Sequence, residues 1–390
     1  LFAMYTATNQ NAHKKPEFFQ AAMYSIDRGR TWTKINNGKA IIANQSDGIG
    51  GQRDPRLFYY APGKFYVMIM MIGGKERAVR LWKSTDLMNW KAFLDIPHKA
   101  AECIDMYALA VDGDKKNIKW VISSAPTIYE VGNFDGAKWT GLGMRNKHNQ
   151  VNKFDYGDCY YAAQTFNHSP DGRVVHVGWL NSGSSFVEKG MPFTQQMSVP
   201  AEITLRTTPD GIRMFRNPVI ELKDLYIKTD TFEQISVKDA NVKLAALNPE
   251  LIDMTIKFAP AGNFDLNLRG QKITYEERAK AFKFTNLARK ARIEAQQIAN
   301  AKLPKDKQRL IRDNSTKRVP APTENGTVKL RVLVDRASLE LFVNDGQAAA
   351  SFSVVPDKDN RKITVTGNDS MKFKSIVVNE LKSAWSHIKD

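Results

Sequence analysis

The sequence has few of the residues that build cross-linked or metal-bound domains. Its 390 residues include two cysteines and six histidines, and the histidines have no metal-ligand spacing. This excludes a disulfide scaffold and a cysteine-based zinc module. A Gly-rich strand-to-helix loop of the kind that cradles phosphate is also absent. We therefore expect neither a metal nor an organic cofactor.

Long hydrophobic runs are absent as well. The longest, Phe65–Ile72, has the length of a strand, whereas a membrane helix needs about 20 apolar residues. We therefore expect no membrane partner. The chain opens with Leu-Phe-Ala-Met-Tyr, which is typical of the inside of a buried strand, and no signal peptide is visible. We expect the natural protein to contain residues upstream of Leu1.

Positive charge is in excess, but it is unevenly distributed. The chain has 57 Lys and Arg against 41 Asp and Glu, a net charge of +16. Of this excess, +9 lies between Lys272 and Arg318, with 14 basic and 5 acidic residues. A basic chain raises the hypothesis of nucleic-acid binding, but a local excess favours a solvated helical insertion. We therefore expect no nucleic-acid partner.

A weak repeat marks the first 200 residues, where short apolar runs alternate with turn residues. Ser25–Trp32 has the pattern Ser-x-Asp-x-Gly-x-Thr-Trp, and Ser84–Trp90 and Gly132–Trp139 are looser copies. Their tryptophans are 58 and 49 residues apart. A period near fifty, with several short strands in each, is typical of propeller blades.

The second half reads as another β domain. Alternating apolar residues in 328–334 and 339–343 end in Asn344-Asp345-Gly346, a hairpin signature that favours a β-sandwich. We predict a propeller domain over 1–206, a linker over 207–226 and a sandwich over 227–390. A basic, helical insertion is predicted at about 275–313.

Two carboxylates stand out by their context. Asp54 lies between Arg53 and Pro55, and Glu102 precedes Cys103 and an apolar run. They are 48 residues apart, about one blade, so both can face one central funnel. Two carboxylates there suit acid/base work on a glycosidic bond. Taken alone, an Arg-Asp-Pro triplet is more often a turn, and a lone Glu is more often a surface residue.

Several motifs resemble glycoside hydrolase family 32, the β-fructofuranosidases, levanases and exo-inulinases. The resemblance covers nearly the whole chain, and its motifs occur in the family's order. They are Arg53-Asp54-Pro55, Glu102-Cys103, Asp155-Tyr156-Gly157 with Tyr160–Phe166, Val177–Asn181, Met191–Leu205 and Leu333–Gly346.

The resemblance implies an all-β fold, a five-bladed β-propeller followed by a C-terminal β-sandwich, with the first blade incomplete in this chain. It implies a retaining hydrolase that releases fructose from a fructan such as levan or inulin, or from sucrose. Glu102 takes the role of general acid/base, Asp54 that of transition-state stabiliser and Arg53 that of substrate binding. An acid at neutral pH needs a raised pKa, so we expect burial or a nearby carboxylate to raise the pKa of Glu102.

One part of the family pattern is absent. The family's nucleophile is the Asp of a Trp-Met-Asn-Asp-Pro motif, which does not occur in these 390 residues. The chain is then a fragment, which its opening in mid-strand favours, or a member that lost its catalytic blade. We expect it to be inactive as it stands. The alternative is a non-catalytic fructan-binding propeller protein. The sandwich signature at Leu333–Gly346 argues against the related five-bladed glycosidases that act on arabinan.

Two aromatic residues are further candidates for substrate binding. Trp179 and Tyr160 lie within the motifs and are candidates to line a sugar platform, although packing between blades is the more frequent role of such residues. A polymeric substrate favours an extracellular or periplasmic location. The sequence carries no prediction of oligomeric state.

Overall fold

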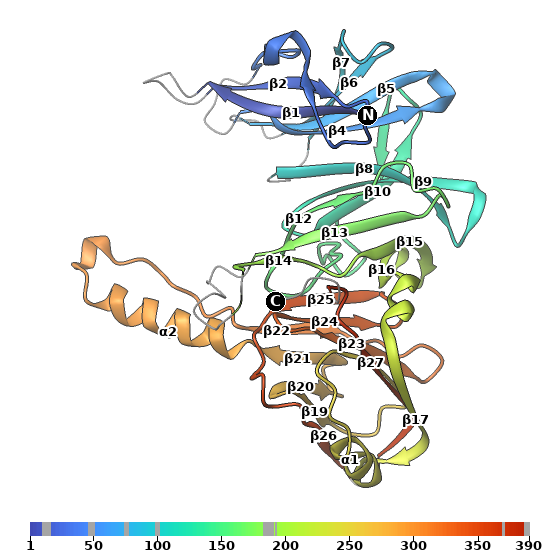
Figure 1. Ribbon diagram of the computed structural model, residues 1–390, viewed down its shortest axis with the longest axis vertical. Helices are drawn as coiled ribbons and strands as arrows, with labels where there is room; N and C mark the ends of the chain where they lie inside the picture. Colours follow the sequence, from blue (N-terminus) through green and yellow to red (C-terminus); the bar gives the residue numbers. More distant parts are fainter. Residues whose placement is uncertain are drawn as a thin grey trace. The chain divides into compact units, whose positions relative to one another are not determined.

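The structure is a computed structural model that describes residues 1–9, 17–45, 51–73, 78–97, 102–181, 191, 193–368 and 371–385. Strands dominate it, with two α-helices in the described part (Figure 1). The all-β prediction is thereby confirmed. No helix among these residues is long and apolar enough to cross a membrane.

The chain divides into two compact units. The first contains residues 1–153, 161–176 and 204–214, and the second contains 154–160, 177–203 and 215–390. Strands β12, β13, β15 and β16 therefore contribute residues to both. Each unit is described by itself.

Three antiparallel sheets in the first unit follow one another along the chain. Two are whole sheets, with the orders β1-β2-β3 and β4-β5-β6-β7, and the third, β11-β10-β9-β8, is part of a nine-stranded sheet. The strands are β1 (Phe2–Asn9), β2 (Glu17–Tyr24), β3 (Thr33–Lys34), β4 (Arg53–Tyr60), β5 (Phe65–Ile72), β6 (Ala78–Ser84), β7 (Lys91–Pro97), β8 (Glu102–Val111), β9 (Asp114–Ala125), β10 (Ile128–Phe134) and β11 (Trp139–Gly141). Such successive up-and-down sheets are blades, as the repeat predicts.

The repeated motif forms the turn before the last strand of each sheet. Asp27 accepts a hydrogen bond from Thr31 N at 2.9 Å, Asp86 from Asn89 N at 2.8 Å and Asp135 from Lys138 N at 2.7 Å. The first two tryptophans close their own turns, since each indole N–H donates to a backbone carbonyl of the turn at 3.0 and 2.9 Å. The Asp that all three copies share therefore reports turn chemistry.

The core of the first unit explains the apolar run of β5. Val67, Ile69 and Met71 pack into one buried cluster, and the alternate residues Met68 and Met70 pack into another. Successive side chains of a strand point to opposite faces. A strand buried on both faces is apolar throughout, which is why this run shows no alternation.

The strands after β11 are β12 (Tyr160–Thr165), β13 (Val174–Leu180), β14 (Gln196–Met197), β15 (Ala201–Thr208) and β16 (Gly211–Pro218). In the first unit β15 runs parallel to β8, with Leu205 opposite Val111. Residues 211–218, which the sequence places in a linker, form a strand paired with β15. A short 3₁₀ helix, Ile220–Leu225, follows it.

Two sheets of the second unit form the β-sandwich. One has the order β17-β27-β18-β23-β24-β25 and the other β22-β21-β20-β19-β26. Their strands are β17 (Tyr226–Ser236), β18 (Ile252–Phe258), β19 (Phe264–Leu268), β20 (Gln271–Glu276), β21 (Ala281–Thr285), β22 (Thr316–Pro320), β23 (Val328–Val334), β24 (Ser338–Val343), β25 (Ala348–Ser353), β26 (Ile363–Gly367) and β27 (Lys372–Leu381). The predicted hairpin at Asn344-Asp345-Gly346 joins β24 to β25, with Val343 opposite Ala348.

An aromatic cluster fills the sandwich between its sheets. Phe258 lies 5.0 Å from Phe264, 4.8 Å from Tyr275 and 6.4 Å from Phe373, ring centre to ring centre. All four rings are at most 2 % exposed and come from β18, β19, β20 and β27. Edge-to-face contacts of this kind stabilise beyond the area that they bury.

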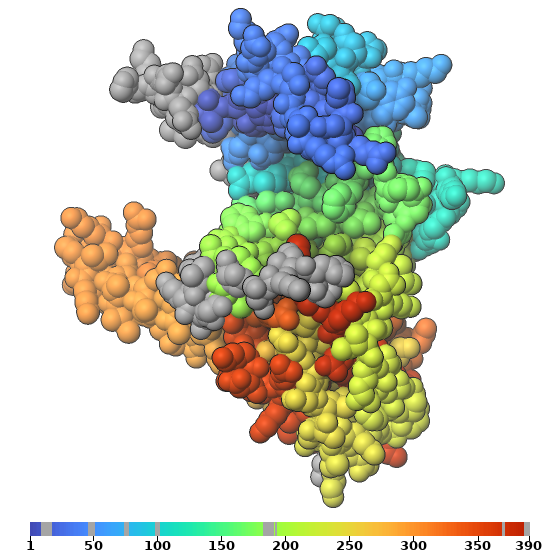
Figure 2. Space-filling model, viewed as in Figure 1, coloured from blue at the N-terminus to red at the C-terminus, as the bar shows by residue number. Residues whose placement is uncertain are grey.

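The helical insertion is shorter than the sequence predicts. Residues 271–276 and 281–285 belong to strands β20 and β21, and helix α2 covers Leu287–Ala301. The Asn286 side chain caps α2 by accepting from Arg289 N at 3.1 Å. In Figures 1 and 2, α2 and the chain that follows it (orange) stand away from the two sheets of this unit. A shorter helix, α1 (Val237–Ala245), packs onto the sandwich core.

Candidate active site

The predicted carboxylates lie where two neighbouring sheets begin. Arg53 is the first residue of β4 and Glu102 the first of β8. Each strand has a β-bulge directly after this first residue. The pairing register shifts between Arg53 and Arg56 in β4 and between Glu102 and Asp105 in β8. The bulged residue is in the left-handed region in each case, with φ 61° at Asp54 and 53° at Cys103. Bulges re-aim side chains beside functional sites.

A third strand repeats this conformation. Tyr161 is the second residue of β12, and Ala162 after it has a φ of 47°. The side chains that precede the three left-handed residues form one hydrogen-bonded chain. Arg53 Nη2 donates to Glu102 Oε2 at 2.7 Å, and the Tyr161 hydroxyl donates to Glu102 Oε1. Glu102 is therefore held from both sides.

Asp54 is hydrogen-bonded to the beginning of β8, the strand that carries Glu102. Its Oδ2 accepts a hydrogen bond from Cys103 N at 2.9 Å and lies 3.7 Å from Arg53 Nε. The backbone N–H of Asp54 donates to Thr6 Oγ1 at 3.0 Å. The side chains of Arg53, Asp54 and Glu102 are 23, 32 and 30 % exposed. They form a polar cluster that a ligand can reach.

A buried layer of polar contacts supports this cluster. Asp105 is fully buried and accepts hydrogen bonds from Arg56 Nε at 2.8 Å and Thr165 N at 2.7 Å. Arg56 Nη2 also donates to Thr165 Oγ1 at 2.7 Å. These residues belong to β8, β4 and β12, so the ion pair and its hydrogen bonds with Thr165 join the three strands whose first two residues carry the site. Buried charges are tolerated where they are paired in this way.

The electrostatics of Glu102 differ from the expectation. Hydrogen bonds from Tyr161 and then Arg53 lower the pKa of Glu102, and partial burial acts in the opposite direction. The predicted raised pKa is wrong for this arrangement, because both partners donate to the carboxylate and favour its ionised form. The Tyr161 phenol responds in the opposite sense, since burial and the Glu102 charge raise its pKa to about 12.

Cys103 supports the site through its backbone N–H, which donates to Asp54, and its thiol is not a nucleophile. Burial, followed by the charges of Asp54 and Glu102, raises the pKa of its thiol to about 12. A thiol that stays protonated is a poor nucleophile. Both Cys103 and Cys159 are free thiols.

The structure brings Arg53, Asp54 and Glu102 together and places the two aromatic candidates in the second unit. Tyr160 is 4 % exposed, and the guanidinium carbon of Arg216 lies 4.3 Å from its ring centre. We therefore leave Tyr160 out of the proposed site. Trp179 is partly exposed on β13, opposite Met197 of β14. Its role in binding stays a prediction.

Tyr161 is the functional residue that sequence reasoning missed. Adjacent strand residues point to opposite faces, so choosing Tyr160 from the Tyr-Tyr-Ala stretch selected the buried face. A signal was present in the spacing, because Arg53, Glu102 and Tyr161 follow one another at intervals of 49 and 59 residues, close to the 58 and 49 residues between the repeated tryptophans.

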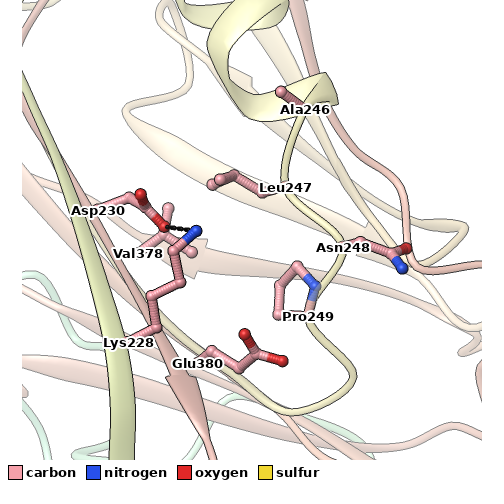
Figure 3. Close-up of a pocket in the computed structure, with 8 residues that line it drawn as sticks. All are labelled: Lys228, Asp230, Ala246, Leu247, Asn248, Pro249, Val378 and Glu380. Carbon is pink, nitrogen blue, oxygen red and sulfur yellow. Dashed lines mark ion pairs between the residues drawn. The ribbon is translucent and has the colours of Figure 1, made fainter.

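A surface hollow in the second unit shares no residue with the carboxylate cluster and is lined mostly by aliphatic and charged residues (Figure 3). It has a volume of about 240 Å³, and its lining includes Lys228, Asp230, Leu247 and Glu380. Lys228 Nζ pairs with Asp230 Oδ2 at 3.0 Å. None of its lining residues is aromatic. In the described part of the chain no cluster of three His, Cys, Asp or Glu side chains is placed to hold a metal ion.

Both halves of the chain match models of one protein family. The N-terminal domain of glycosyl hydrolases family 32 matches residues 1–218, and the C-terminal domain of that family matches residues 221–380. The match spans the candidate site and the sandwich.

Two levanases are similar to this chain along almost its whole length. The levanase of Bacillus subtilis (strain 168) is 28 % identical over 413 residues, covering 99 % of this chain and 57 % of the levanase. A levanase of Bacillus sp. (strain L7) is 27 % identical, covering 99 % and 43 %. The chain thus spans about half the length of these levanases.

An exo-inulinase from Aspergillus awamori has a similar fold, with a TM-score of 0.77 at 20 % identity, over 98 % of this chain and 80 % of that structure. This confirms the predicted fold class, all-β with propeller blades followed by a β-sandwich. Since the two family models together account for all but a few of the residues from 1 to 380, the chain belongs to family 32 of the glycosyl hydrolases.

Proposed function

We propose that this chain carries the acid/base half of a retaining glycoside hydrolase that releases fructose from β-fructosides. The observation that supports it is the bridged cluster of Arg53, Asp54 and Glu102 at adjoining strand starts, in a family 32 chain. The printed names of its relatives, levanases and exo-inulinases, favour fructans as substrates.

The proposed roles follow from the contacts. Glu102 gives a proton to the leaving oxygen and later takes one from water, since one carboxyl group serves as acid and then as base. The carboxylate of Asp54 stabilises the positive charge that develops on the fructosyl ring. Arg53 orients Glu102 through the hydrogen bond from its Nη2, and its positive charge beside both carboxylates is placed to bind the substrate.

The lowered pKa of Glu102 suits the second of these steps. Ionised Glu102 is the form that accepts a proton from the attacking water. For the first step the pKa must rise, and a second carboxylate placed about 5–5.5 Å away has this effect. The family's nucleophile would be such a carboxylate.

The Asn-Asp-Pro motif of that nucleophile does not occur in the printed sequence. We propose that these 390 residues alone bind fructosides without completing the cycle. The second candidate function is a non-catalytic fructan-binding protein, in which the same partly exposed cluster of Arg53, Asp54 and Glu102 holds the sugar.

Hydrolysis of levan, inulin and sucrose by the natural protein that carries this chain is the test. Glu102→Gln is expected to lower kcat/KM by about 10²–10⁴-fold, the range of general acid/base catalysis. Asp95→Asn is the control, because it removes an exposed ion pair with Arg80 in the same unit. An unchanged rate in Glu102→Gln would refute the assignment. Calorimetric binding of a fructo-oligosaccharide without release of fructose would support the binding function instead.

A further inference from the structure

A buried ionic cluster in the second unit takes no part in the proposed reaction. It consists of Arg216 on β16, Glu340 on β24, Ser351 on β25 and Asp155 in the segment before β12. Arg216, Asp155 and Glu340 have side chains that are 1 % exposed, and Ser351 is fully buried. Two carboxyl groups thus share one guanidinium away from water, which leaves one negative charge uncompensated if both are ionised.

The hydrogen-bond donors around Asp155 fix its state. Its Oδ2 accepts from Arg216 Nη2 at 2.6 Å, and its Oδ1 accepts from Gly157 N at 2.7 Å and Ser351 N at 3.3 Å. A carboxyl group surrounded by donors on both oxygens is most stable as the ionised acceptor.

Counting protons on Ser351 then decides the state of Glu340. The Ser351 hydroxyl oxygen lies 2.9 Å from Asp155 Oδ2 and 3.0 Å from Glu340 Oε2, and it also accepts from Arg216 Nη2 at 3.1 Å. A hydroxyl has one proton to donate. If it donates to Asp155, the contact with Glu340 is a hydrogen bond only when the proton is on Glu340.

The remaining contacts of Glu340 agree with that placement. Its Oε1 accepts from Val199 N at 2.8 Å, which leaves Oε2 as the oxygen that holds the proton. Arg216 Nη1 lies 3.6 Å from this Oε2, beyond hydrogen-bond distance, and has no hydrogen-bond partner among the described residues. An ionised Glu340 would attract this N–H group into contact.

We propose that Glu340 is a protonated acid at neutral pH, and that it donates to Ser351, which donates to Asp155, so that the cluster is neutral and pH-sensitive. The relay joins β24 and β25 to the segment of Asp155. Loss of the proton leaves a buried, uncompensated anion and weakens this junction.

The charged and titratable groups around the cluster are consistent with the assignment. Burial raises the pKa of Glu340, and that of Asp155 to about 6, while Arg216 opposes both shifts. Burial raises the pKa of Tyr160 to about 12 and that of Cys159 well above its usual range, so both stay neutral below pH 8. Burial also raises the pKa of Asp158, which lies beside Arg289. Its contribution to the pH dependence of stability is the same in wild type and in Glu340→Gln, so it cancels in their difference.

Two amide variants of the full chain test the proposal as a matched pair. Glu340→Gln is expected to fold, because a Gln oxygen accepts from Val199 N and its NH₂ group donates to Ser351, as protonated Glu340 does. Asp155→Asn is expected to be much less stable at every pH, because its NH₂ group would face either Arg216 or two backbone N–H groups.

The stability difference between wild type and Glu340→Gln is to be measured from pH 5 to pH 8. A proton that is held in the folded state and lost in the unfolded chain makes the wild type less stable as pH rises. The folding constant of the wild type relative to Glu340→Gln should therefore fall about tenfold per pH unit until the cluster ionises.

A difference that does not change with pH would overturn the proposal, because Glu340 would then be ionised in both states. A tolerated Asp155→Asn beside an unfolded Glu340→Gln would also overturn it, by placing the proton on Asp155. Infrared spectroscopy is the second readout. The wild type at pH 7 should show a protonated-carboxyl band that Glu340→Gln lacks, and a wild type without it contradicts the assignment.

Discussion

Glu102 is held by two donors that lie far apart in the sequence and on different strands. Arg53 comes from β4 and Tyr161 from β12, and both bind the carboxylate that starts β8. At the residue scale, the site is therefore tuned toward an ionised Glu102. Asp54 is oriented independently, by Cys103 N.

Removing one of these donors should raise the pKa of Glu102. Tyr161→Phe deletes the hydrogen bond that contributes most to the lowered pKa, so the carboxyl should take up its proton at higher pH than in the wild type. The check is a ¹³C NMR titration, with the Glu102 signal identified by its loss in Glu102→Gln. Tyr160→Phe is the matched control, and an unshifted titration in Tyr161→Phe would contradict the assignment.

The lowered pKa of Glu102 also makes the stability of the folded protein depend on pH. A carboxyl whose pKa is lowered in the folded protein adds stability above its unfolded pKa and loses it as pH falls through the folded pKa. Tyr161→Phe should therefore reduce stability near neutral pH and leave it unchanged in strong acid.

At the scale of elements, the ion pair of Asp105 and Arg56 fixes the strand starts that carry the site. Breaking a buried pair leaves one charge without compensation. Asp105→Asn should lower the free energy of unfolding by about 3–5 kcal/mol. The exposed Arg80–Asp95 pair is the control, and Asp95→Asn should cost at most about 1 kcal/mol. Urea unfolding of both variants measures this, and equal losses would show that Asp105 has no special structural role.

The hairpin turn between β24 and β25 depends on a glycine for two reasons. Gly346 has a φ of +92°, and a Cβ there would lie 2.2 Å from Arg216 O. Gly326 has a φ of +70° with no atom within 4 Å of the added Cβ. Gly326→Ala should therefore cost about 1 kcal/mol for the left-handed backbone alone.

Gly346→Ala should cost at least about 2 kcal/mol more, because backbone must move away from the new methyl group. Thermal unfolding of the two variants gives the comparison. Similar melting temperatures would mean that the turn adapts without strain.

At the scale of the whole molecule, much of the architecture follows from the sequence. The Asp turns, the two-sided apolar run of β5 and the Asp-Gly hairpin all depend on local chemistry, so they were predictable. The pairing of β16 and the short length of α2 depend on tertiary contacts, so they were not.

The site divides in the same way. Arg53, Asp54 and Glu102 are marked by their motifs, and the structure brings them together. The bulges that aim them, and the choice of Tyr161 over Tyr160, depend on which strand face is buried. The direction of the Glu102 pKa depends on two donors whose positions a single sequence does not reveal.

Net charge leads to a prediction at this scale too. A fructan is uncharged, so its binding releases few counterions despite the +16 charge of the chain. Raising salt from about 0.05 to about 0.5 M should change the Kd for a fructo-oligosaccharide by less than about twofold. Calorimetry measures this, and a steep loss of affinity would contradict the prediction, because it would mean that binding of the sugar depends on charge.

The most direct test of the account is chemical rescue of Glu102→Ala in the natural protein, with an activated β-fructoside as substrate. Azide can take the place of water in the second step, attacking the anomeric carbon of the fructosyl-enzyme while the enzyme carboxylate leaves. Azide should restore turnover and yield fructosyl azide of retained configuration. A variant that keeps full activity, ignores azide or gives the inverted product would contradict the role of Glu102 as the acid/base of a retaining fructosidase.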